Sequence, residues 1–231
     1  MEKKKWARQA LELLRSLLPE TAKIPIISLT GSRAFGWGGE GYDIDLRAVI
    51  ACRGYWDTFH HGQIFDLNCE ELEHLFGQLY YRHWTPFEDL ANPIHLMDEF
   101  HYEEFMDLCS ADNVRCHLFT IKTQIAQAEI ANTVRPTLHA YRLTLVPLHF
   151  LKTGEIQVHV PTLAEIYNVK YFEALADSYR RRQQFKGDLK PALEEVHRLL
   201  RTLLNELERS TSHFEKEKVE RWKATVIAEL Y

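Results

Sequence analysis

Residues 26–50 constrain the fold most, because an apolar run, a glycine-rich turn and an alternating segment follow one another there. The run at 26–29 has the composition of a buried strand. In the later segment polar and apolar residues alternate, so Asp43 and Asp45 should share one face of a second strand. This stretch therefore predicts a β-sheet with two closely spaced carboxylates.

The residues around these aspartates indicate one kind of chemistry. Two carboxylates this close repel each other unless a cation lies between them, and carboxylate oxygens suit Mg²⁺ or Mn²⁺. Gly31 and Ser32, at the end of the first strand, offer backbone N–H groups and a hydroxyl to phosphate oxygens. We interpret the pattern as phosphoryl or nucleotidyl transfer. Exposed aspartates at a strand edge are the alternative.

The spacing of these residues resembles the signature of the DNA polymerase beta-like nucleotidyltransferases. In that superfamily a Gly-Ser pair at a strand end is followed by an acidic-hydrophobic-acidic strand, with a third acid on a later strand. Here ten residues, 33–42, separate Ser32 from the Asp-Ile-Asp sequence. The strand-like run at 63–68 contains Asp66, which becomes the third acid. Asp57 is the alternative, although its surroundings are aromatic and typical of a turn.

Two longer strings are similar to one branch of this superfamily, the predicted bacterial and archaeal nucleotidyltransferases. Some members of that branch are associated with RNA ligases in RNA repair. The first string spans residues 31–47, and the second, at 135–156, has a His-x-x-Arg-Leu core and a closing Thr-Gly-Glu-Ile. The resemblance covers about residues 26–156. It implies Mg²⁺- or Mn²⁺-dependent transfer of NMP from an NTP such as ATP to an acceptor hydroxyl. An RNA end is the slightly favoured acceptor, and a small molecule or a protein is the alternative.

The resemblance also implies roles for individual residues. Asp43, Asp45 and Asp66 would be the catalytic metal ligands, and Gly31 and Ser32 would bind the nucleotide phosphates. These five residues form the predicted catalytic centre.

Four cations or potential cations are further candidates for nucleotide binding. Arg33 follows the Gly-Ser pair and could reach a phosphate, or it could cap the turn or pair with a nearby acid. His139 and Arg142 are three residues apart and so share a helix face, and Lys122 lies in the preceding helix. The alternatives are a buried core histidine at 139 and a structural ion-pair partner at 142.

The pattern predicts an α+β fold with two domains. Residues 1–110 would form a nucleotidyltransferase core with a helix at 3–18 and a small mixed sheet. Residues 111–231 would form an all-helical domain, because apolar residues recur at helical spacing throughout. The expected helices there are 114–131, 135–152, 161–184, 188–209 and 212–230. The last two could alternatively build a dimer interface, and the sequence leaves the oligomeric state open.

Composition sets broader limits. The chain of 231 residues is 45% hydrophobic and 26% charged, as expected of a globular protein, and its net charge of −5 argues against a general nucleic-acid coating. A local basic contact to RNA stays open at 180–182 with Lys186, which otherwise form a solvated helix end. Cys109, Cys116 and His117 lack the spacing of a zinc site, so reduced thiols are expected. With no signal peptide or long apolar segment, we expect a cytoplasmic protein without a membrane partner.

Two other functions are compatible with the sequence. The chain could bind nucleotide or RNA without catalysis, although all three acids are present. It could instead be an antitoxin-like interaction partner, although such proteins are usually shorter and lack a long helical region.

Overall fold

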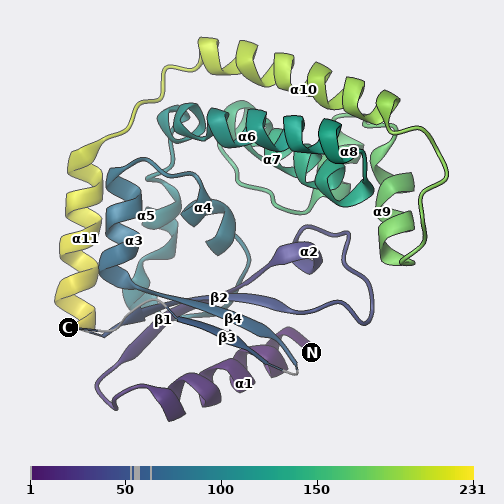
Figure 1. Cartoon of the computed structure of the whole chain (residues 1–231). Helices are drawn as coiled ribbons and strands as arrows, with labels where there is room; N and C mark the ends of the chain where they lie inside the picture. The colour runs from purple at the N-terminus through teal and green to yellow at the C-terminus, as the bar shows by residue number, and fades with distance from the viewer. Residues whose placement is uncertain (1, 53, 55–57, 63) are drawn as a thin grey trace. The chain divides into compact units, whose positions relative to one another are not determined.

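The computed structural model describes residues 2–52, 54, 58–62 and 64–231 (Figure 1). It is a mixed α+β structure. The strands are β1 (Lys23–Thr30), β2 (Asp45–Ala51), β3 (Thr58–His61), β4 (Asp66–Glu71) and β5 (Pro93–Leu96). The helices are α1 (Glu2–Leu17), α2 (Gly31–Ala34), α3 (Leu72–Tyr80), α4 (Thr85–Leu90), a 3₁₀ turn (Asp98–Phe100), α5 (Tyr102–Met106), α6 (Ala111–Ala131), α7 (Val134–Thr153), α8 (Val160–Ile166), α9 (Phe172–Arg180), α10 (Lys190–Arg209) and α11 (Lys216–Leu230).

The chain divides into two compact units that are not continuous in sequence. The first, which we call the sheet unit, contains residues 1–31, 43–110 and 213–231. The second, the helical unit, contains residues 32–42 and 111–212. The division predicted between 110 and 111 coincides with one crossing between units, but it does not describe 32–42 or 213–231.

The sheet unit is built on a mixed sheet with the strand order β3-β4-β2-β1-β5. β1 pairs antiparallel with β2 and β5, β2 pairs parallel with β4, and β3 pairs antiparallel with β4. Figure 1 shows α1 on the opposite side of the sheet from α3 and α4. Both faces are thus covered, which explains why β1 is buried along almost its whole length.

Several elements differ from the sequence predictions. The strand expected at 63–68 begins instead at Asp66 and continues to Glu71, so Glu70 belongs to the sheet. The edge strands β3 and β5 were not predicted, because each has four residues and shows no clear alternation. In the part of the chain that the structure describes, no helix is both long and apolar enough to cross a membrane.

The helix predicted at 161–184 is two shorter helices, α8 and α9. Asn168, between them, has φ +52°, a left-handed conformation that asparagine tolerates and that ends α8. The buried carboxylate of Glu195 on α10 accepts the backbone N–H groups of Lys170 (3.1 Å) and Tyr171 (3.4 Å). It also accepts the hydroxyl of Tyr141 at 2.9 Å. Glu195 therefore satisfies N–H groups just before α9, an arrangement that depends on a residue 25 positions away.

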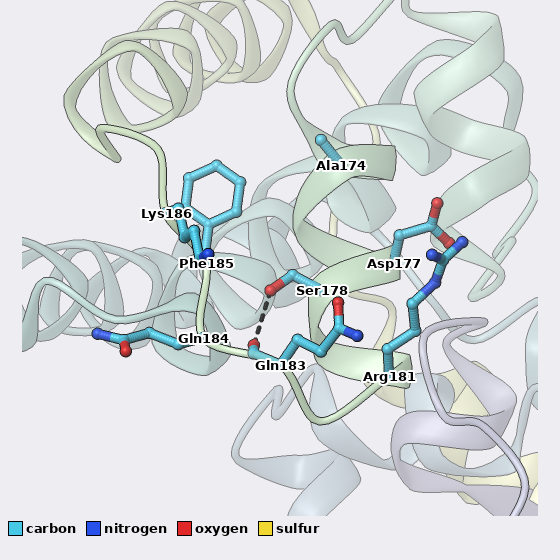
Figure 2. A pocket seen from close by; sticks show the side chains of 8 residues that line it. All are labelled: Ala174, Asp177, Ser178, Arg181, Gln183, Gln184, Phe185 and Lys186. Atoms are coloured by element: carbon cyan, nitrogen blue, oxygen red, sulfur yellow. Dashed lines mark hydrogen bonds between the residues drawn. The ribbon is translucent and has the colours of Figure 1, made fainter.

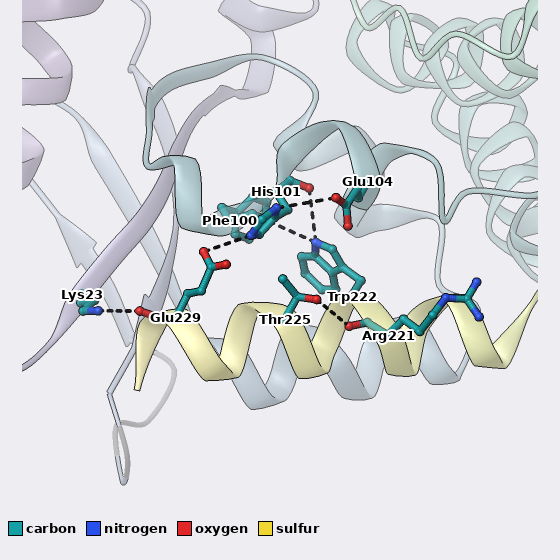
Figure 3. A network of polar contacts seen from close by, with 8 residues as sticks. All are labelled: Lys23, Phe100, His101, Glu104, Arg221, Trp222, Thr225 and Glu229. Carbon is teal, nitrogen blue, oxygen red and sulfur yellow. Dashed lines mark hydrogen bonds and ion pairs between the residues drawn. The ribbon is translucent and has the colours of Figure 1, made fainter.

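The last helix, α11, packs in the sheet unit, although we predicted it in the helical domain. Its Trp222 is buried and contacts the ring of Phe76 edge-on, at 5.6 Å between centroids, and that of Phe100 at 5.4 Å. Figure 3 shows the indole Nε1 donating to the backbone oxygens of Phe100 (3.1 Å) and His101 (3.3 Å). The same figure shows Glu229 paired with His101 at 3.1 Å. An apolar stripe alone does not reveal which partner buries it, and here the partner lies more than 100 residues upstream.

Candidate active site

Gly31 directly follows the last residue of β1, and its backbone lies against Asp45. Gly31 has φ +67°, in the left-handed region that favours glycine. A Cβ atom there would lie 1.8 Å from Oδ2 of Asp45 and 2.7 Å from its Cβ. The preceding Thr30 donates from Oγ1 to the backbone oxygen of Asp45 at 3.3 Å. The close approach of these two strand ends therefore requires glycine at position 31.

Asp45 and Asp66 lie directly opposite each other on the parallel strands β2 and β4. Residues paired in this way project from the same side of a sheet. Asp43 is exposed and lies just before β2, separated from Asp45 by the buried Ile44. This burial pattern agrees with the predicted alternation. The structure thus makes Asp45 and Asp66 neighbours, and Asp43, which was predicted on the same strand as Asp45, lies two residues before it and outside β2.

The ligand chemistry of this group suits a hard divalent cation. All three side chains offer carboxylate oxygens, which Mg²⁺ and Mn²⁺ prefer. Over the residues that the structure describes, no group of three or more His, Cys, Asp or Glu side chains is gathered as a metal site. Mg²⁺ does not need such a cage, because it commonly binds through one or two carboxylates, several waters and substrate phosphates. The pair Asp45 and Asp66 fits that mode.

His61 contacts Asp66, and sequence reasoning missed this pair. On β3 it lies directly opposite Asp66, and its Nδ1 is 2.6 Å from Oδ1 of that aspartate. The histidine side chain is 77% exposed, whereas that of Asp66 is only 16% exposed. The contact holds one carboxylate oxygen of Asp66 and directs the side chain. No signal in the sequence pointed to it, since the register of an unpredicted edge strand creates the pair.

A buried ion pair lies further along the same face of the sheet. Arg47 on β2 contacts Glu70 on β4 at 2.8 Å, and Gln78 on α3 donates to the same carboxylate at 2.7 Å. Burial raises the pKa of Glu70, and the charge of Arg47 opposes that shift. The ion pair with Arg47 and the hydrogen bond from Gln78 compensate the buried carboxylate for its lost hydration. The contacts among Arg47, Glu70 and Gln78 connect β2, β4 and α3 near Asp45. Arg47 therefore has a structural role.

Ser32 and Arg33 belong to the helical unit, within the segment 32–42. The backbone oxygen of Ser32 accepts the N–H of Gly38 at 2.8 Å. The guanidinium of Arg33 donates to the backbone oxygen of Tyr42 from Nε at 3.3 Å and from Nη2 at 3.2 Å. Arg33 thus joins the two ends of the glycine-rich segment, which is the capping alternative considered for it.

His139 and Arg142 on α7 contact the same segment within the helical unit. The ring of His139 meets Trp37 edge-on at 5.4 Å, and the guanidinium of Arg142 lies over Phe35 at 4.3 Å from the ring centroid. Burial, reinforced by the charge of Arg142, lowers the pKa of His139 to about 4. His139 is therefore neutral near pH 7, and Arg142 supplies the positive charge on this face. Lys122 lies exposed on α6.

Neither the scan against protein-family models nor the search of curated proteins found a match to this chain. Asp57, the alternative third acid, lies outside the described residues.

Proposed function

We propose that this protein is a metal-dependent nucleotidyltransferase, which transfers NMP from an NTP to an acceptor hydroxyl and releases pyrophosphate. The observation that carries the proposal is the direct register of Asp45 and Asp66, with Gly31 packed against Asp45. A carboxylate pair of this kind can hold the divalent ions that stabilise the attacking and leaving oxygens in phosphoryl transfer. The resemblance of residues 26–156 to the polymerase beta-like superfamily supports the same function.

In this proposal Asp45 and Asp66, assisted by Asp43, hold Mg²⁺ or Mn²⁺. The bound ion supplies positive charge to the triphosphate and lowers the pKa of the attacking hydroxyl. His61 keeps Asp66 oriented through its 2.6 Å contact, so that the second oxygen of this carboxylate stays directed. The buried Arg47–Glu70 pair keeps β2 and β4 in register, which preserves the spacing of the two aspartates.

The phosphates are assigned to the glycine-serine turn. Gly31 and Ser32 contact them through backbone N–H groups and the hydroxyl, as the resemblance implies. The acceptor oxygen attacks the α-phosphorus in line, the bond from that phosphorus to the bridging oxygen breaks, and pyrophosphate leaves. The proton of the hydroxyl passes to the oxygen of Asp66 that His61 does not hold, and from there to water. Arg33, Lys122, His139 and Arg142 remain candidates for nucleotide contacts.

The test is incubation with each α-³²P-labelled NTP, Mg²⁺ or Mn²⁺, and a pool of short RNAs. We expect label to enter an acceptor, and EDTA to abolish the transfer. Asp45→Asn should reduce the rate by about 100-fold or more, because it removes a charged ligand and keeps the volume of the side chain. Asp107→Asn is the matched control, since it makes the same change at an exposed site of the sheet unit.

The outcomes separate the candidate functions. Transfer by the wild type and the control, but not by Asp45→Asn, supports the enzyme. NTP binding that Asp45→Asn loses, without transfer to any acceptor, would favour a binding module. Equal transfer by all three proteins would refute the assignment of Asp45.

A further inference from the structure

A groove in the helical unit is lined by the end of α9 and by the loop that follows it (Figure 2). Its volume is about 740 Å³. Its lining includes the cations Arg181 and Lys186, the amides Gln183 and Gln184, and the aromatic Phe185. We propose that this groove binds a single-stranded polynucleotide, the acceptor strand of the transfer reaction. The role of this strand as acceptor rests on the proposed function, whereas the binding of a single strand does not.

The three consecutive arginines at 180–182 do not act alike. Arg180 pairs with Asp177 at 3.0 Å and also with Glu173. Arg182 donates to the backbone oxygen of Gly41 at 2.6 Å, so it anchors the chain within the helical unit. Of the three arginines, Arg181 is the one that lines the groove. Arg180 and Arg182 therefore have structural contacts, and Arg181, between them, can contact a ligand.

Across the part of the chain that the structure describes, the side chains of Arg181, Gln183, Gln184 and Lys186 make no hydrogen bond or ion pair with another residue. Their donors are thus open to a ligand. The acidic residue that lines this groove is Asp177, which shares the guanidinium of Arg180 with Glu173. Asp188 lines the pocket that shares the segment 183–185. The local charge is positive although the whole chain carries −5. A negatively charged ligand fits this lining.

The backbone of the loop is held in place even though its side chains are open. Ser178 and Gln183 exchange two bonds: Ser178 Oγ donates to the backbone oxygen of Gln183 at 2.9 Å, and the N–H of Gln183 donates to the backbone oxygen of Ser178 at 3.0 Å. At the other end, Asp188 Oδ1 accepts the N–H of Lys190, the first residue of α10, at 2.9 Å. The groove is therefore a formed surface.

Phe185 indicates which class of anion is bound. A Cβ atom at Gly187 would lie 2.7 Å from two atoms of the Phe185 ring, so the ring rests on a glycine and stays half-buried. Single-stranded nucleic acids bind where bases stack on such rings and cations follow the phosphates. Gln183 and Gln184 add amide groups that can reach base edges.

An adjoining pocket of about 360 Å³ shares the segment 183–185 with this groove. A ligand that occupies both pockets must be elongated and must pass Phe185. A strand of several nucleotides has that form, whereas a mononucleotide does not. The lining carries nothing that distinguishes a ribose from a deoxyribose, so the shared chemistry is that of a single strand.

The test is fluorescence anisotropy with 5′-fluorescein-labelled 12-nucleotide RNA and DNA, using the full chain without NTP or metal. Arg181→Gln/Lys186→Gln should weaken binding and reduce its salt dependence. Loss of two phosphate contacts lowers the slope of log K against log salt concentration by about 1.4. The factor by which affinity falls between 50 and 200 mM salt should therefore be about sevenfold smaller than for the wild type. Phe185→Leu should weaken binding about tenfold, since it removes the stacking face.

The matched control is Arg201→Gln/Lys170→Gln, which also removes one arginine and one lysine charge, at another pocket of the helical unit. It should bind like the wild type. Equal loss in both double variants, or no binding of RNA or DNA at 100 μM protein, would overturn the proposal. So would a glutamate-rich peptide that displaces the strand. Selective binding of RNA and equal binding of RNA and DNA both support the proposal. The comparison shows whether the bound strand is RNA alone or either nucleic acid.

The same assay separates this inference from the proposed function. Asp43→Asn/Asp45→Asn should bind the strand normally, because both changes lie in the sheet unit. Strand binding without nucleotidyl transfer would refute the enzyme and leave the groove supported. Transfer to RNA that is unaffected by all groove substitutions would refute the groove and leave the enzyme supported.

Discussion

Replacement of Gly31 by alanine tests the packing of the candidate site. The change has two costs. A left-handed φ of +67° costs a residue with a Cβ about 1–2 kcal/mol. The new methyl would also lie 1.8 Å from Oδ2 and 2.7 Å from Cβ of Asp45. Rotation of the carboxylate relieves only the first of these overlaps, so the backbone of β1 or β2 must shift, at about 1–3 kcal/mol more.

Gly54 provides a matched control within the sheet unit. Its φ is +79°, but among the residues that the structure describes a Cβ there would meet no atom within 4 Å. We therefore expect Gly54→Ala to lower the free energy of unfolding by about 1–2 kcal/mol, and Gly31→Ala to lower it by about 2–5 kcal/mol. Gly31→Ala should also abolish transfer, because it displaces Asp45.

Urea denaturation followed by tryptophan fluorescence measures both free energies, and the radiolabel assay measures activity. The difference between the two variants is the informative quantity, because it removes the backbone penalty that they share. If both variants lost the same stability within about 0.5 kcal/mol, the close approach of Gly31 and Asp45 would be refuted.

Two further predictions concern the packing of each unit. In the helical unit, burial and the charge of Arg142 lower the pKa of His139 to about 4 from its ordinary 6.5, so the unfolded chain binds more protons between these values. Stability should therefore fall as pH drops from 6.5 to 4, by on the order of 1–2 kcal/mol from this residue at pH 5. Urea denaturation at pH 5 and 7 should show a smaller fall for His139→Gln, and an unchanged fall would contradict the assignment. In the sheet unit, Trp222→Ala should cost about 4 kcal/mol, because it empties the space beside Phe76 and Phe100. A loss below about 1 kcal/mol in the same denaturation assay would show that α11 is not part of that core.

The local elements near the candidate site were predictable from short-range patterns. The apolar run before Gly31 and the alternation of Asp43, Ile44 and Asp45 depend only on the period of a strand. The helical periodicity after residue 111 likewise predicted α6, α7 and α10 within a few residues. These features are local, since each follows from neighbours within one or two turns of chain.

Other features required the tertiary structure. The parallel register of β2 and β4 sets Asp66 opposite Asp45, and the edge strand β3 brings His61 to the same carboxylate. Burial of Glu70 and the packing of α11 in the sheet unit also escaped the sequence patterns. The sequence by itself determined the strand β1, the alternation around Asp45 and the helices α6, α7 and α10, and it suggested which carboxylates to test as metal ligands. Only the tertiary structure decided which of them meet, because pairing and burial depend on residues far apart along the chain.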